Sequence, residues 1–306
     1  MGIGQKFLAT TAVGLATACS LNSSIASSTT AAQLKEAAKE DATAYDASQS
    51  PTQNTDTASL KRSHEWDRLN KLGRRYEERG DYSKAEPLFV RCLRLSNSHE
   101  QRAISCDNLA SIYRSRAKLQ QALPWLKKAL ELREQAEGVN GSGVETSLNN
   151  LSDLYHDMGD LTQAVELTKR AVAIARLERD KGVRTANLPN NLNSLALLYK
   201  EQGDREDTES LFKQVVDLQS GDPNANPGDY ANNLNNLARL YREDGRFEAA
   251  EPLYKQSLQL REKTFGGKSA QVGATLRNYA IVLRALNRDS EAANMDRRAS
   301  AIEDKR

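Results

Sequence analysis

The chain repeats itself from about residue 63 to its end, and this repetition limits the possible folds more than any other feature. Six anchor residues recur at intervals of 37 to 44 positions: Tyr76, Tyr113, Tyr155, Tyr199, Tyr241 and Leu283. The positions seven and four residues before each anchor hold an apolar residue, a tyrosine or a cysteine. The position three residues before each anchor holds glycine, alanine or serine. Because these spacings return to one side of an α-helix, the pattern predicts an amphipathic helix in each repeat, with a small residue where a second helix approaches.

A second helix is predicted after each anchor. Nine residues beyond the anchors stand Ala85, Ala122, Ala164, Thr208, Ala250 and Ala292. Between the two helices of most repeats lies a glycine or an asparagine: Gly80, Gly159, Gly203, Gly245 and Asn287. These residue types supply the left-handed backbone that ends a helix, so the pattern predicts six helix–turn–helix units. In the second repeat Ala117 and Lys118 replace the glycine, and we expect a less well-defined turn there.

This arrangement resembles the tetratricopeptide repeat, whose signature is L-G-x-x-Y followed by A-x-x-x-F. The segments Leu72–Tyr76 and Ala85–Phe89 match it closely. The period near 42 residues and the segments Asn235–Tyr241 and Glu248–Tyr254 are similar to the long repeats of kinesin light chains. The resemblance implies an all-α fold without sheet: a right-handed superhelical solenoid of six repeats over residues 63–306, whose first helices line a concave groove.

The N-terminus has the pattern of an export signal. Lys6 precedes an uncharged apolar stretch, Phe7 to Ala18, which is too short to span a bilayer. The following Cys19 resembles the lipidated cysteine of bacterial lipoproteins. We therefore expect residues 1–18 to be a signal peptide. Residues 19–62 are rich in Ser, Thr, Ala, Asp and Gln, and we expect a disordered tether.

The composition argues against several classes of function. Forty-three Lys and Arg residues against 41 Asp and Glu give a net charge of +2, which does not favour nucleic acid or anionic lipid as a partner. The sequence has no convergent acid, base and nucleophile, and its three cysteines and three histidines offer little for a metal site. We expect a monomeric, non-enzymatic protein without cofactor or metal, which binds a protein or peptide.

The partner-binding residues are predicted on the exposed side of the first helices. They are Asn108, Asn150, Asn190, Asn232, Asn236, Asn278 and Arg242. An asparagine side chain both donates and accepts hydrogen bonds, so a row of them is suited to hold the backbone of an extended peptide. These asparagines resemble the peptide-holding asparagines of kinesin light chains. In the alternative interpretation they hydrogen-bond neighbouring turns of the protein itself.

A line of basic residues follows the anchors by one position. It consists of Arg114, His156, Lys200, Arg242 and Arg284. These residues predict that the partner includes acidic groups, although Asp153, Asp157, Glu201 and Glu243 lie among them. The preferred function is an adaptor or assembly scaffold in the bacterial cell envelope. The alternatives are a self-assembling structural protein and an accessory subunit of an envelope enzyme.

Two cysteines flank the turn between the first and second repeats. Cys92 stands near the end of one predicted helix and Cys106 near the start of the next, at similar distances from His99. In an oxidising periplasm they could form a disulfide, which would stabilise the fold by roughly 3 kcal/mol. The alternative is a pair of small buried thiols.

The processed N-terminus tests the export signal. We expect the exported chain to lose residues 1–18, with a lipid on Cys19 if the signal is of the lipoprotein type. Ordinary cleavage after Ala18 or Ala26 would instead give a periplasmic protein, and an apolar tail on a cytosolic protein would stay intact. The intact mass of the purified protein distinguishes these forms, and retention of residues 1–18 would contradict export.

Overall fold

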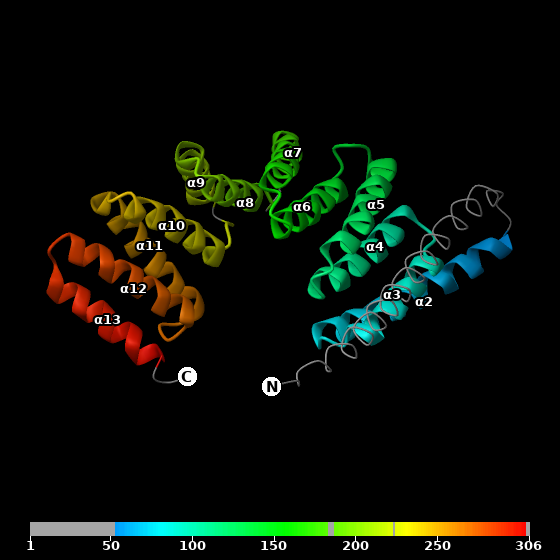
Figure 1. Ribbon diagram of the computed structural model, residues 1–306, viewed down its shortest axis with the longest axis horizontal. Coiled ribbons are helices and arrows are strands. Elements are labelled where there is room, and N and C mark those ends of the chain that lie inside the picture. Colours follow the sequence, from blue (N-terminus) through cyan, green and yellow to red (C-terminus); the bar gives the residue numbers. More distant parts are fainter. Residues whose placement is uncertain (1–52, 183–186, 223, 304–306) are drawn as a thin grey trace, which may run out of the picture. The chain divides into compact units, whose positions relative to one another are not determined.

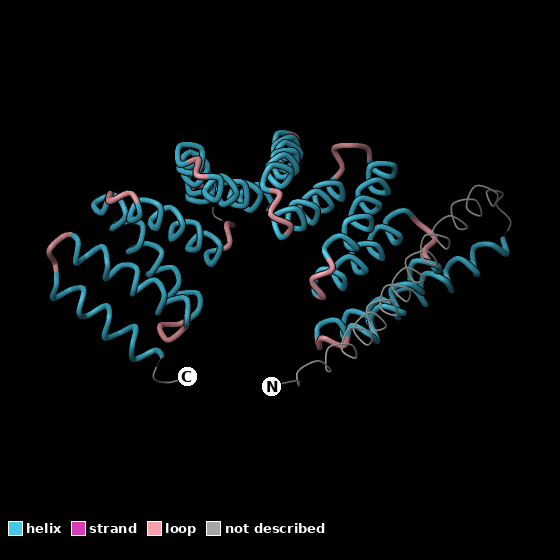
Figure 2. The backbone as a smooth tube through the Cα atoms, viewed as in Figure 1, coloured by secondary structure: helices cyan, strands magenta, loops and turns pink. Residues whose placement is uncertain are grey.

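The computed structural model describes residues 53–182, 187–222 and 224–303, and every regular element in these ranges is an α-helix (Figure 1). The helices are α2 (Gln53–Glu78), α3 (Tyr82–Leu95), α4 (His99–Ser115), α5 (Leu119–Glu137), α6 (Ser142–Asp157), α7 (Leu161–Asp180), α8 (Asn187–Gln202), α9 (Arg205–Ser220), α10 (Pro227–Glu243), α11 (Phe247–Phe265), α12 (Ala270–Ala285) and α13 (Asp289–Glu303). Figure 2 shows that the described helices are joined by loops and turns. The predicted all-α repeat fold is confirmed. None of these helices is both long enough and apolar enough to cross a membrane.

The helices form six consecutive pairs, one pair for each predicted repeat. The first helices of the repeats are α2, α4, α6, α8, α10 and α12, and the second helices are α3, α5, α7, α9, α11 and α13. From α3 onward, each helix packs against the next one along the chain. The repeats lie in a unit that spans Arg68–Arg306. Within this unit each repeat is stabilised mainly by its neighbours, as in other repeat proteins.

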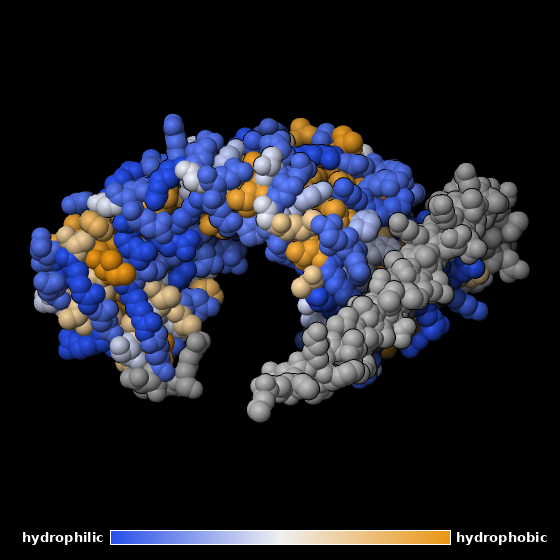
Figure 3. All heavy atoms as spheres, viewed as in Figure 1, coloured by the Kyte–Doolittle hydropathy of each residue, from blue (hydrophilic) through white to orange (hydrophobic). Residues whose placement is uncertain are grey.

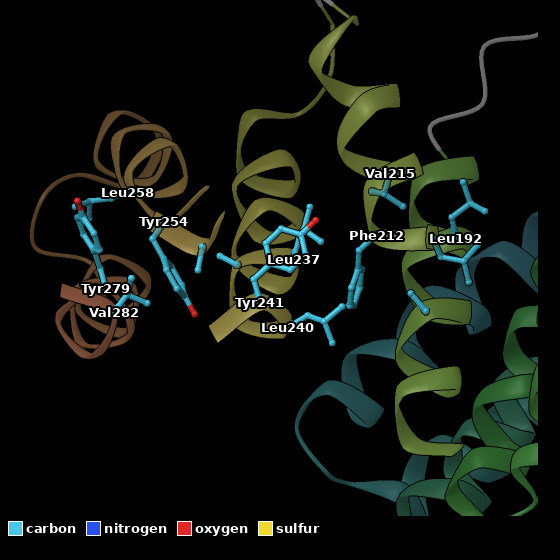
Figure 4. Close-up of a cluster of buried hydrophobic side chains, with 14 of the residues drawn as sticks. Leu192, Phe212, Val215, Leu237, Leu240, Tyr241, Tyr254, Leu258, Tyr279 and Val282 are labelled. Carbon is cyan, nitrogen blue, oxygen red and sulfur yellow. The ribbon is translucent and has the colours of Figure 1, made fainter. Parts of the chain in front are cut away.

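The apolar positions predicted from the anchors form the core. The residues seven positions before the anchors are all buried: Leu69, Cys106, Leu148, Leu192, Leu234 and Leu276. At Gly73 a Cβ atom would lie 2.6 Å from Cε1 of Phe89, which explains the small residue where the second helix approaches. Figure 4 shows Phe212 and Tyr254 within the largest cluster, which extends from α7 to α13. Figure 3 shows that the visible surface is mostly hydrophilic, with separate hydrophobic patches.

All six repeats close the turn between their helices with the same hydrogen bond. The carbonyl oxygen of each anchor accepts, at 2.8–2.9 Å, from the backbone N–H of Asp81, Lys118, Asp160, Asp204, Arg246 or Arg288. The residue before each donor has a φ between 55° and 85°. This is the Schellman arrangement, and it confirms the left-handed residues predicted from glycine and asparagine. The expectation of a less regular turn in the second repeat is wrong, because Ala117 adopts the same conformation despite its Cβ atom.

Helix α2 begins at Gln53, well before residue 63, where the sequence placed the start of the repeat domain. Residues 53–62 contain neither glycine nor proline. Once the packed part of α2 around Leu69 has formed, such residues extend the helix at little cost, because propagation is easier than nucleation. The last part of the predicted tether is therefore helical. The predicted signal peptide and Cys19 lie outside the described residues.

At four of the five repeat junctions, a buried hydrogen bond joins a residue at or near the C-terminal end of a second helix to the next first helix. The pairs are Ser96 Oγ with Ser105 Oγ (3.5 Å), Arg133 Nη1 with Ser147 Oγ (2.6 Å), Asn233 Nδ2 with Gln219 Oε1 (2.8 Å) and Arg261 Nη1 with Thr275 Oγ1 (2.6 Å). All eight residues are buried. A buried polar group without a partner costs about 1–3 kcal/mol, so these pairs favour one register between neighbouring repeats.

The junction between the third and fourth repeats is built differently. Asn191, on the first helix, donates to Oε1 of Glu145 at 2.8 Å and accepts from Asn149 at 3.0 Å. Glu145 is 1% exposed, and among the described residues its Oε2 atom has no hydrogen-bond partner. Burial raises the pKa of the Glu145 carboxyl; the hydrogen bond from Asn191 opposes this, and the charge of Glu178 adds to it. This junction therefore holds a carboxyl group in an unfavourable environment.

Cys92 and Cys106 are both buried, and the disulfide that the sequence allowed does not join them in the structure. Cys106 belongs to an apolar cluster that includes Ala129 and Leu132 of α5. Its side chain thus contributes to the core inside the second repeat. Burial raises the pKa of the Cys106 thiol to about 12 and keeps it protonated, which makes it a poor nucleophile for disulfide formation.

The positive φ of Ala117 gives a prediction for stability. The left-handed conformation costs an alanine roughly 1–2 kcal/mol, whereas glycine adopts it freely. We expect Ala117→Gly to raise the free energy of unfolding by about 1 kcal/mol, measured by urea denaturation. The reciprocal change, Gly159→Ala, should lower it by a similar amount, because Gly159 has a φ of 80° and open space around its Cα. Loss of stability in Ala117→Gly would contradict this account of the turn.

The buried carboxyl of Glu145 gives a prediction for pH dependence. Its pKa is raised, so the folded state binds the proton more tightly than the unfolded chain does. The contribution of this group to the free energy of unfolding therefore falls as the pH rises above 4.5, the ordinary glutamate pKa. Glu145→Gln removes the charge and keeps an acceptor for Asn191. We expect it to raise the melting temperature at neutral pH, and the gain should shrink as the pH falls toward 4.5.

Thermal melting across this pH range checks the prediction. Glu78→Gln, at an exposed position on α2, is the matched control and should show no such pH-dependent gain. A lower melting temperature of Glu145→Gln at neutral pH would show that the ionised carboxyl is stabilising.

Candidate partner-binding surface

The predicted binding residues all lie on first helices of the repeats. We call the surface that they form the first-helix face; it comprises Asn108, Asn150, Asn190, Asn232, Asn236, Arg242 and Asn278. Asn190 and Asn232 are exposed, and the others are partly buried. The helical spacing of three and four residues puts Asn232 and Asn236 of α10 on the same side of that helix.

Three of these asparagines form hydrogen bonds between neighbouring first helices. Nδ2 donates from Asn108 to Asn70 Oδ1 (2.7 Å), from Asn150 to Asp107 Oδ1 (3.2 Å) and from Asn236 to Asn193 Oδ1 (3.0 Å). The donor stands five residues before its anchor, and the acceptor stands six residues before the anchor of the preceding repeat. These three asparagines thus form hydrogen bonds within the protein, but to the preceding repeat and not to neighbouring turns of their own helix.

These bonds leave part of each carboxamide available. A side-chain amide has two N–H groups and an oxygen with two lone pairs, and the contact between repeats uses one N–H group. The other N–H group and the Oδ1 atom of Asn108, Asn150 and Asn236 can still bind a ligand. The internal bond also limits rotation of the amide, so less conformational freedom is lost when a ligand binds.

The row of asparagines changes in its middle and at its C-terminal end. In the fourth repeat the equivalent residue is Ser194, which is exposed. In the sixth repeat Asn278 accepts a hydrogen bond at 2.7 Å from Nη1 of Arg242. Asn232 accepts from Nη2 of Arg261 at 2.8 Å. The structure therefore brings Arg242 and Asn278 into direct contact. Asn190 lies on α8, the same helix as Ser194, which interrupts the row.

The basic line along the first helices is largely neutralised by the next repeat. Arg114 pairs with Asp157, Nε2 of His156 lies 2.8 Å from Glu201, and Nζ of Lys200 lies 2.6 Å from Glu243. In each case the acid stands two residues after the anchor of the following repeat. Three of the acids that the sequence places among the basic residues thus pair with them. Spacing predicted the positions of these charges, but the pairing depends on how neighbouring helices are aligned.

Sequence reasoning missed a further contact at three of the junctions. In each, a tyrosine hydroxyl donates to a glutamate of the preceding repeat, and that glutamate also pairs with an arginine. The three sets are Tyr113 with Glu86 (3.0 Å) and Arg116, Tyr241 with Glu209 (3.3 Å) and Arg246, and Tyr279 with Glu251 (3.1 Å) and Arg288. Burial and, to a smaller extent, the nearby glutamate raise the pKa of Tyr113 and Tyr279 to about 12. An acidic residue ten positions after an anchor was the signal in the sequence. These tyrosine, glutamate and arginine side chains hold neighbouring repeats together, so their polar groups are already engaged within the protein.

A hollow of about 500 Å³ lies along α7, apart from the first-helix face. Its walls are Lys169, Val172, Ala173, Arg176, Leu177 and Asp180 of α7, and Leu195 of α8. None of the predicted binding residues lines it.

Comparison with known proteins agrees with this architecture. A family model of the tetratricopeptide repeat matches residues 101–176, 184–263 and 229–304, and a second model of the same repeat matches residues 67–99. No curated protein is significantly similar to the chain in sequence.

Several solved structures are similar in fold. A kinesin light chain-like protein of Podosopora anserina with nearly identical TPR-like repeats has 22% identity and a TM-score of 0.55, over 69% of this chain and 98% of that one. BtubC (BKLC) of P. vanneervenii has 18% identity and a TM-score of 0.60, over 81% and 92% of the two chains. PilF of Pseudomonas aeruginosa has 16% identity and a TM-score of 0.56, over 77% and 90%. At these identities the likeness concerns the fold alone. Because the family models match well over half of it, the chain belongs to the tetratricopeptide repeat family.

Proposed function

We propose that this protein is a non-catalytic adaptor or scaffold that binds an extended segment of a protein partner along the first-helix face. The tetratricopeptide repeat fold commonly serves as a scaffold for protein–protein interaction. The observation that carries the proposal for this chain is the row of asparagine side chains, one per repeat in most repeats, whose carboxamides are held in place and only partly used.

The chemistry of this row suits a peptide backbone. An extended chain presents N–H and C=O groups at regular intervals, and a carboxamide can bind either group. Such contacts do not depend on the sequence of the ligand, so additional selectivity must come from other residues on the same face. Asn150 and Asn236 lie on opposite sides of the interruption at Ser194, and each would hold a different part of the segment.

The location of the protein forms part of the proposal. The apolar stretch from Phe7 to Ala18 and the following Cys19 support export and attachment to the bacterial envelope through a lipid. A single acyl chain binds a membrane weakly, and the lipid of a lipoprotein carries several, so the attachment would be stable. The repeats would then meet their partner close to a membrane surface.

Replacement of the two asparagines tests the binding role. The probe is a peptide selected with the full-length wild-type chain from a random-sequence library displayed on phage. We expect Asn150→Ala combined with Asn236→Ala to weaken binding of this peptide about tenfold, because two net hydrogen bonds of about 0.5–1.5 kcal/mol are lost. Isothermal titration calorimetry measures the affinity, and circular dichroism should show unchanged helix content.

The matched control is Asn140→Ala combined with Asn294→Ala. Both control residues are exposed and lie outside the first helices. This variant should bind the peptide as the wild type does. If the double change at Asn150 and Asn236 leaves the affinity intact while the helix content is preserved, the first-helix face is not the binding surface.

A further inference from the structure

The line of basic residues on the first helices ends without its partner. Arg114, His156 and Lys200 each pair with a carboxylate two residues after the anchor of the next repeat. For Arg242 the corresponding residue is Ala285, which has no charge. The side chain of Arg242 donates instead to the neutral Oδ1 of Asn278 at 2.7 Å. Arg284, the last base of the line, pairs with Asp296 of α13.

Arg242 is thus the one base among these five that forms no ion pair within the described part of the chain. Its side chain is only partly buried, so a ligand can reach it. A guanidinium group has five N–H donors in a planar arrangement that matches a carboxylate. The bond to Asn278 uses one of them.

The surroundings of Arg242 add a second, independent observation. Three buried polar atoms of the fifth repeat have no hydrogen-bond partner in the part of the chain that the structure describes: Asn235 Oδ1, Arg239 Nε and the hydroxyl of Tyr254. Arg239 Nε lies 3.9 Å from Glu243, whose carboxylate is closer to Lys200. Burial raises the pKa of Tyr254 to about 12, although the charges of Arg242 and Arg239 lower it. Figure 4 shows Tyr254 beside Tyr279, which belongs to α12, the helix of Asn278.

We propose that Arg242, with Arg239 and Asn278, binds an aspartate or glutamate side chain of the partner, so that the junction of the fifth and sixth repeats selects an acidic residue. The proposal rests on the proposed function and adds a specificity-determining site to it. A ligand carboxylate takes the place that an acid in the sixth repeat would occupy if the pattern of the earlier repeats continued. The asparagines hold the backbone of the segment, and Arg242 determines which residue fits at one position.

The test restores the missing acid. Ala285→Glu places a carboxylate where the three earlier repeats carry theirs, and Arg242→Gln removes the unpaired cation. Arg114→Gln is the matched control, since it removes a base that is already paired with Asp157. A random-sequence peptide library displayed on phage is selected in parallel against the four full-length chains. We expect peptides selected by the wild type and by Arg114→Gln to be enriched in Asp or Glu at one position, and the other two chains to lose this enrichment.

Affinity then measures the effect on a single peptide. A peptide selected by the wild type is synthesised with its acidic residue and with the matching amide. Replacement of the acid should weaken binding to the wild type about tenfold, because a charge-assisted pair is lost. The same replacement should weaken binding to Ala285→Glu by less than about twofold. Thermal melting confirms that both variants are folded, and Arg242→Gln provides the result independently if Ala285→Glu is unstable.

Two outcomes separate this inference from the function on which it rests. Peptides that bind through Asn150 and Asn236 but show no acidic enrichment, or keep it in both Ala285→Glu and Arg242→Gln, would overturn the acidic site and leave the binding face intact. A wild-type chain that selects no peptide dependent on Asn150 and Asn236 would overturn the proposed function and this inference together.

Discussion

The structure depends on the alignment of each helix pair with the next. A single pair leaves apolar surface on both of its sides, so the core forms only when neighbouring repeats stack. Apolar contacts alone would tolerate a small slip between helices, because hydrophobic burial is not directional. Buried polar pairs such as Arg133 with Ser147 and Gln219 with Asn233 do not tolerate it, since a shift would leave their donors and acceptors without partners. They therefore define the register in which the anchors, the turns and the asparagine row are repeated.

The first helices combine this structural task with the one proposed for binding. Their polar residues form contacts between repeats, and the same residues face the surface on which a partner would lie. Asn150 illustrates both roles: it binds Asp107 of the preceding repeat through one N–H group and keeps the rest of its carboxamide free. The arrangement of charges follows the same rule. Where the next repeat supplies an acid, the base is neutralised, and at Arg242, where it does not, a cation remains for other molecules.

The sequence predicted most of the fold because its strongest signals are local. The spacing around each anchor located the helices, and glycine or asparagine marked five of the six turns. It missed Ala117, since an alanine gives no sign that it will adopt a positive φ when the surrounding turn demands it. The start of α2 was placed too late because residues 53–62 have few apolar side chains, although they continue a helix nucleated farther on. The sequence also allowed a disulfide between Cys92 and Cys106, which the structure does not contain. The predicted binding residues all lie on first helices, as their spacing indicated. The pairing of Asn236 with Asn193 and of Lys200 with Glu243 depends on how neighbouring helices are aligned, and periodicity does not contain this information.

The junction pairs have a consequence for the way such a chain can change over generations. Ser96 contacts Ser105, Arg133 contacts Ser147 and Arg261 contacts Thr275, so these second helices carry near their C-terminal ends a group that fits the next repeat. A repeat copied or moved to another place in the gene would put a long arginine against an unsuitable neighbour, or leave two serines too far apart to touch. The order of the six repeats is therefore constrained. Recombination within the gene is expected to keep the two residues of each junction pair together.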